Sequence, residues 1–69
     1  MSELSIKIGQ LIRKKRMENR LTQESLALQC GIDRSYMGRI ERGEVNITIL
    51  KLYEIAKILK VDPKELLPS

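Results

Sequence analysis

The segment of residues 23–42 constrains the fold of this chain most strongly, because within it two short helical patterns flank a tight turn. Thr22 is a favourable N-cap for the first pattern, which spans residues 23–29. The apolar side of this pattern consists of Leu26, Ala27 and Cys30. Gly31 then stands where a chain leaves a helix with a positive φ. The segment therefore predicts two helices joined by a tight turn.

The second pattern, at about residues 34–42, has two chemically different faces. Asp33 is its natural N-cap, and Gly43 ends it. At about 100° per residue, the core side carries Tyr36, Met37 and Ile40. The outward side carries Ser35, Gly38, Arg39 and Arg42, with Arg34 at its edge. One face is therefore expected to be core, and the other is expected to be cationic and exposed.

The cationic face is suited to nucleic acid. Arginine side chains bind guanine edges and phosphate groups through paired hydrogen bonds. A glycine inside a helix costs about 1 kcal/mol relative to alanine, so Gly38 indicates a surface that another molecule approaches closely. The plain alternative is a solvated basic face. The spacing of Ala27, Gly31, Met37 and Ile40 beside this face favours DNA binding instead.

Length and composition limit the fold class. The 69 residues suffice for one domain, residues 1–69, with a small core that dimerisation would stabilise. Hydrophobic residues make up 42% of the chain and only two residues are aromatic, which indicates an aliphatic helical core. The net charge of +4 favours a polyanionic partner, although a negatively charged membrane surface would also attract it.

Three further helices are expected outside the central segment. They span about residues 5–19, 49–60 and 63–67, with Ser5, Thr48 and Asp62 as their N-caps. Residues 1–4 are expected to form a frayed arm. No strand pattern is present, so the sequence predicts an all-α, compact bundle of about five short helices.

Catalytic and metal-binding patterns are missing from the sequence. There is no histidine, which removes the commonest general base and metal ligand. Cys30 alone is too little for a zinc site, and its apolar helix position predicts a buried structural thiol. We therefore expect no enzymatic activity, metal, cofactor or small-molecule ligand. No secretory signal or run of about 20 apolar residues occurs, so we expect a cytoplasmic protein without a membrane partner.

Over almost its whole length, the sequence resembles the Cro and phage-repressor (Xre-type) family of helix-turn-helix DNA-binding proteins. The matching positions are residues 21–27, Gly31, residues 37–43, residues 55–61 and residues 65–67. Within that family, residues 33–36, 40–43 and 46–48 are most similar to the controller proteins of restriction-modification systems. The resemblance implies a lambda-repressor-like DNA-binding domain that acts as a sequence-specific transcriptional regulator.

The resemblance and the outward face of the second pattern together suggest roles for individual residues. For reading bases we expect Arg34, Ser35 and Arg39. For phosphate contact and positioning we expect Gln23, Tyr36, Arg42 and Asn46, with Tyr36 equally suited to the core. The resemblance also implies a partly buried ion pair between Arg16 and Glu41, which would hold the first helix against the third.

The helix expected at residues 49–60 is apolar around more of its circumference than a simple surface helix. One short recognition helix reads only a few base pairs, and two-fold dimers place two such helices about 34 Å apart. We therefore expect a homodimer on an inverted-repeat operator in double-stranded DNA. Its interface is expected to consist of Leu50, Tyr53, Ile58, Leu66 and Leu67.

Three functions are compatible with these patterns. The first is control of restriction-modification genes, including the regulator's own, by repression and activation, with RNA polymerase as a candidate partner. The second is an antitoxin or a small phage-type repressor, which only the neighbouring genes separate from the first. The third is a helical protein-interaction module without specific DNA binding. The outward arginines argue against this third function.

Overall fold

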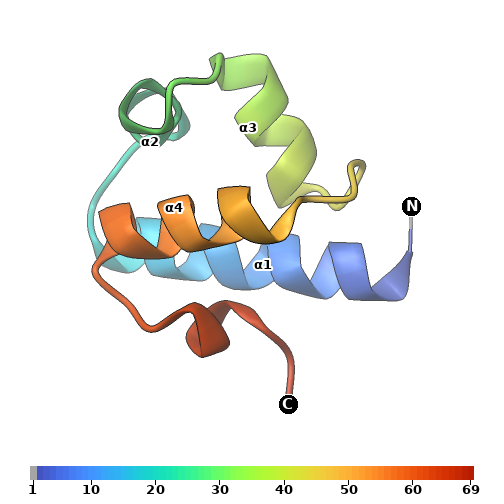
Figure 1. Ribbon diagram of the computed structural model, residues 1–69. Helices are drawn as coiled ribbons and strands as arrows, with labels where there is room; N and C mark the ends of the chain where they lie inside the picture. The colour runs from blue at the N-terminus through green and yellow to red at the C-terminus, as the bar shows by residue number, and fades with distance from the viewer. Residues whose placement is uncertain (1) are drawn as a thin grey trace.

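The computed structural model describes residues 2–69 and contains only helices in that range. They are α1 (Glu3–Glu18), α2 (Gln23–Cys30), α3 (Arg34–Glu41), α4 (Ile49–Leu59) and the 3₁₀ helix η1 (Pro63–Leu66). Figure 1 shows α1 and α4 across the middle of the molecule, with α2 and α3 on one side and η1 on the other. The expected all-α bundle is confirmed. None of these helices is long and apolar enough to cross a membrane.

The start of α1 differs from the prediction. Ser2, rather than Ser5, is the N-cap, and its Oγ accepts a hydrogen bond from the Ser5 backbone N–H at 3.0 Å. The helix therefore already includes Glu3, whose carboxylate lies 3.1 Å from the Lys7 ammonium. An acidic residue in the first turn also interacts favourably with the helix dipole. The predicted frayed arm is wrong from Ser2 onward, and Met1 lies outside the described residues.

The caps that flank the central turn agree with the prediction. Thr22 Oγ1 accepts a hydrogen bond from the Ser25 N–H at 3.0 Å, which opens α2. Asp33 Oδ1 accepts one from the Tyr36 N–H at 2.8 Å, which opens α3. Between them, Gly31 adopts a left-handed conformation with φ of 71°. These local bonds set the angle at which α3 leaves α2.

Aliphatic side chains from all five helices form the core. The largest fully enclosed side chains are those of Ile12, Leu26, Met37, Ile55, Leu59 and Leu66. Leu66 is 0% exposed because a capping box between Asp62 and Glu65 turns η1 back against α1 and α4. The prediction that Leu66 belongs to a dimer interface is therefore wrong, since its side chain is buried inside its own chain.

Cys30 is buried at the end of α2, as its apolar position predicted. Burial raises the pKa of its thiol above the ordinary value. The thiolate is the reactive form of cysteine, so the thiol of Cys30 fills space in the core rather than serving as a nucleophile.

Two glycines allow α1 to lie directly against the end of α3. A Cβ at Gly9 would lie 2.5 Å from the carbonyl oxygen of Ile40 and 2.6 Å from that of Glu41. Gly43 has a φ of 76°, and a Cβ there would lie 2.5 Å from the Cα of Ile6. Backbone thus meets backbone at both positions. This close contact fixes the orientation of α3 relative to the rest of the bundle.

Candidate nucleic-acid interface

The outward face of α3 is cationic, as predicted. The exposed side chains at this face and at the end of the helix are Arg34, Ser35, Arg39 and Arg42, whereas Met37 and Ile40 are buried. Gly38 lies among the exposed residues but is itself covered. A Cβ at Gly38 would lie 3.1 Å from Nη1 of Arg42 and 3.6 Å from Oε1 of Gln23. Two polar side chains therefore cover the glycine, and it becomes accessible only where they move aside.

Two open grooves meet along the line where α2 faces α3. One, of about 480 Å³, is lined by Arg16, Thr22, Gln23, Glu24 and Arg34. The other, of about 450 Å³, is lined by Gln23, Arg34, Ser35, Gly38 and Arg42. Gln23 and Arg34 line both grooves, so the two form one continuous polar surface. Four of the seven residues predicted to contact DNA therefore lie together: Gln23, Arg34, Ser35 and Arg42.

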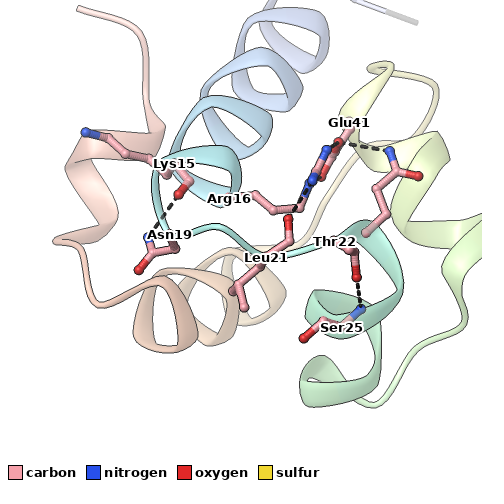
Figure 2. Close-up of polar contacts among 8 residues, drawn as sticks. Lys15, Arg16, Asn19, Leu21, Thr22, Ser25 and Glu41 are labelled. Carbon is pink, nitrogen blue, oxygen red and sulfur yellow. Dashed lines mark hydrogen bonds and ion pairs between the residues drawn. The ribbon is translucent and has the colours of Figure 1, made fainter.

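A buried ion pair supports this surface from behind (Figure 2). Nε of Arg16 lies 2.7 Å from Oε2 of Glu41, and Nη2 of Arg16 donates to Oε1 of Glu41 at 3.1 Å. The side chain of Glu41 is only 2% exposed and that of Arg16 only 11%. Arg16 also donates to the carbonyl oxygen of Leu21 at 2.8 Å. The predicted pair is therefore present, and it joins α1, α3 and the start of the α2 segment.

Gln23 belongs to the same network, which the sequence analysis did not predict. Its Nε2 donates to Oε1 of Glu41 at 3.0 Å. The donor end of this amide is therefore turned toward the protein, and its acceptor end, Oε1, faces the space above Gly38. The Nε2 group carries two hydrogens, and the bond to Glu41 uses one of them. The second hydrogen remains for the phosphate contact predicted for Gln23, which stays a prediction.

The position of Glu44 at this surface was not predicted from the sequence either. It follows Gly43, and its carboxylate lies between two arginines of the outward face. Its Oε2 lies 2.6 Å from Nε of Arg42, and its Oε1 lies 3.9 Å from Nε of Arg39. The hydrogen bond from Arg42 lowers the pKa of the Glu44 carboxyl below its usual value. By contrast, no carboxylate within residues 2–69 lies within ion-pair distance of Arg34.

Three other residues predicted to contact DNA have neighbours within the protein. The hydroxyl of Ser35 donates to Oδ1 of Asp33 at 2.8 Å, which leaves its oxygen as an outward acceptor. Tyr36 is partly buried and packs against the core, in agreement with the alternative role considered for it. Oδ1 of Asn46 accepts a hydrogen bond from Ser5 at 3.1 Å. Asn46 therefore lies beside the first turns of α1, beyond the end of α3.

The apolar residues predicted for a dimer interface do not form a single set. Leu50 and Tyr53 are exposed on α4 and line an apolar groove of about 510 Å³ with Val61 and Pro63. Leu67 is exposed as well, but it lines a different groove beside α1. Ile58 is partly buried and packs against the core. Of the five predicted residues, only Leu50 and Tyr53 share one exposed surface.

The substitution Gly38→Ala is expected to separate stability from DNA binding. The added Cβ meets only the ends of two side chains, Arg42 and Gln23, and no backbone, so replacing a helical glycine should raise the free energy of unfolding by up to about 1 kcal/mol. The same Cβ displaces Arg42 and narrows the groove. Loss of one charged hydrogen bond would weaken DNA binding by about 1.5 kcal/mol. Urea denaturation and a duplex titration test the two effects, and tighter binding would contradict the second.

Comparison with known proteins gives one consistent family. A family model described as helix-turn-helix matches residues 12–66. Control protein C.BamHI of Bacillus amyloliquefaciens is 36% identical over 67 residues, which are 96% of this chain and 83% of that protein. Control protein C.SmaI of Serratia marcescens is 38% identical over 60 residues, covering 87% of this chain and 71% of that protein.

Solved structures agree with the sequence relatives. The crystal structure of the restriction-modification controller protein C.AhdI from Aeromonas hydrophila has a TM-score of 0.84 to this chain and is 41% identical to it. The match covers 88% of each chain. Together with the exposed cationic face of α3, these similarities show that the chain belongs to the helix-turn-helix family and is a DNA-binding transcriptional regulator.

Proposed function

We propose that this protein controls restriction-modification genes, including its own, by binding an inverted-repeat operator as a homodimer. The observation that carries the proposal is the cationic outward face of α3 beside the start of α2, where Gln23 and Arg34 line two adjoining polar grooves. The relatives named as control proteins support the choice of target genes. Activation would require a further contact with RNA polymerase, and access to DNA implies a cytoplasmic location.

Arg34 is the strongest candidate for reading bases. It lies in the first turn of α3, where recognition helices contact base edges. Without a carboxylate partner among residues 2–69, its guanidinium group is available to the O6 and N7 atoms of guanine. Ser35, next to it, offers a hydroxyl oxygen that can accept a hydrogen bond from a base amino group. Arg39, one turn further along α3, is the third candidate.

The residues proposed for phosphate contact and positioning all keep a hydrogen-bond donor. Arg42, Asn46 and the hydroxyl of Tyr36 keep the donor groups that a phosphate contact needs. Gln23 keeps its backbone N–H and one hydrogen of Nε2, because only the other Nε2 hydrogen binds Glu41. That N–H lies at the N-terminus of α2, where unpaired amides attract anions. We therefore assign the phosphate contact of Gln23 to this backbone N–H and to the remaining hydrogen of Nε2.

For the dimer we propose the α4 surface that contains Leu50 and Tyr53. The substitution Tyr53→Asp places a charge in the apolar groove and is expected to yield a monomer in analytical ultracentrifugation at tens of micromolar. Met17→Asp is the matched control, because Met17 on α1 and Tyr53 are both 57% exposed. If the unmodified protein sediments only as a monomer, or if both variants remain dimers, this surface is not the interface.

The function itself is tested by selection from a random duplex library at about physiological salt. Enrichment of an inverted repeat is the expected result, and Arg34→Ala should lower affinity for the selected duplex by about 1–3 kcal/mol. Lys64→Ala, on η1, removes the same charge from the other side of the molecule and should have little effect. Weak, salt-sensitive binding without any selected sequence would contradict the proposal.

A further inference from the structure

Glu44 is the one acidic side chain that the structure places between two arginines of the DNA-facing surface, among residues 2–69. Its backbone N–H donates to the carbonyl oxygen of Arg39 at 2.9 Å, which holds it against the last turn of α3. Its side chain is 38% exposed. A negative charge is thus built into a surface that meets a polyanion. Such a charge repels the phosphates of every duplex. It can favour one DNA sequence over others only if it also improves a contact to the bases of that sequence.

The contacts of Glu44 show how it improves such a contact. Nε of Arg42 donates to the carboxylate at 2.6 Å, whereas Nε of Arg39 lies 3.9 Å from it, close enough for electrostatic attraction only. The bond through Nε leaves the two terminal nitrogens of Arg42 without a hydrogen bond to Glu44. Those two terminal nitrogens form a fork that can contact guanine O6 and N7 together. The carboxylate therefore orients Arg42 for base contact without occupying that end of its side chain, and it attracts Arg39 to the same place.

Glu44 affects the binding of phosphate groups differently from the binding of bases. On random DNA, the affinity comes from Lys and Arg contacts to phosphates and release of counterions. An arginine that is paired with a carboxylate is already partly neutralised, and a phosphate close to it is repelled by the same carboxylate. The lowered pKa of Glu44 keeps it ionised at neutral pH. The carboxylate of Glu44 therefore lowers the affinity for random DNA more than the affinity for the operator.

We infer that Glu44 is a positioning residue for sequence selectivity: by holding Arg42 through Nε and attracting Arg39, it favours base reading and opposes phosphate binding on random DNA. This inference rests on the proposed function, because it assumes an operator that these arginines read. It adds an acidic residue to an interface whose other candidate residues are cationic or neutral. It also distinguishes these two arginines from Arg34, and it gives Arg42, proposed above for phosphate contact, a base-reading role on the operator.

The test compares Glu44→Gln with Glu18→Gln. Each substitution removes one negative charge from an exposed side chain, but Glu18 pairs with Lys15 at 3.5 Å, on the side of α1 that faces η1. Two probes of equal length are used: the duplex that the unmodified protein selects from a random library, and a random-sequence duplex. Dissociation constants are measured for both over a range of salt concentrations. Circular dichroism melting establishes that each variant is folded.

Glu44→Gln is expected to bind the random duplex about two- to tenfold more tightly. The log–log salt slope should steepen by up to about 0.9 if one phosphate contact is gained. Affinity for the selected duplex should change less, so the ratio of the two affinities falls. Glu18→Gln should leave this ratio unchanged. A ratio that stays constant or rises in Glu44→Gln overturns the inference while leaving the proposed function intact.

Failure of the proposed function has a separate signature. It appears when the unmodified protein itself selects no sequence, before any variant is measured. The random duplex then still tests Glu44, because its proposed opposition to phosphate binding requires Glu44→Gln to bind more tightly and with a steeper salt slope. Equal affinity and equal slope would overturn the inference in that case too.

Discussion

Glu41→Ala is expected to lower the free energy of unfolding by about 3–5 kcal/mol, a large part of the stability of so small a domain. The substitution leaves the Arg16 guanidinium group only 11% exposed and without a counterion. It also leaves the Nε2 donor of Gln23 without its acceptor. Chemical denaturation at one fixed protein concentration measures the loss, because the proposed dimerisation would make stability depend on concentration.

Two controls make this result specific. Glu54→Ala breaks an exposed ion pair with Lys51, whose charged atoms lie 3.1 Å apart, and should cost less than about 1 kcal/mol. The double substitution Arg16→Met with Glu41→Leu removes both charges and should cost less than Glu41→Ala alone, since no buried charge is left unpaired. An unchanged melting temperature in Glu41→Ala would show that the pair contributes nothing to the packing of α1 on α3.

Gly9→Ala is expected to lower the free energy of unfolding by about 1–3 kcal/mol. The new methyl group would lie within 2.6 Å of the carbonyl oxygens of Ile40 and Glu41. Both are backbone atoms at the end of α3, so neither can move without displacing the helix. The strain outweighs the gain of up to about 1 kcal/mol that alanine brings to a helix. The midpoint of urea denaturation measures the net change, and an unchanged slope shows that the unfolded state is comparable.

Gly38→Ala is the matched control for Gly9→Ala, because it adds the same methyl group to another helix where only the ends of two side chains are close. Opposite signs are expected for the two variants. If Gly9→Ala stabilised the protein as much as Gly38→Ala, the backbone contact between α1 and α3 would be looser than the distances indicate.

Much of the local structure could be predicted because its signals lie within three residues of each other. Thr22 and Asp33 cap α2 and α3 with their own side chains, and Gly31 provides the left-handed turn. The start of α1 was predicted wrongly because two serines satisfy the same local rule. The tertiary structure uses the hydroxyl of Ser5 for a contact with Asn46, and Ser2 caps the helix.

The environment of a side chain was predicted less well where it depends on residues that are distant in the sequence. Leu66 and Leu67 are adjacent leucines, yet Leu66 is buried in the core and Leu67 is exposed. An apolar residue near the end of a chain is compatible with either environment, and only the path of η1 beneath α1 and α4 separates them. The role of Gly9 was not predicted for the same reason, since the carbonyl groups that it contacts belong to a helix far along the chain.

The sequence by itself therefore determined the helices, their N-caps apart from that of α1, and the cationic face of α3, because these depend on neighbours along the chain. The Arg16–Glu41 pair was inferred from the family resemblance. Tertiary structure alone decided which charges on and beneath that face compensate one another. Glu41 binds Gln23 as well as Arg16, and Glu44 lies between Arg39 and Arg42. The physical reason is that electrostatic partners are chosen by distance in space, which sequence separation does not reveal.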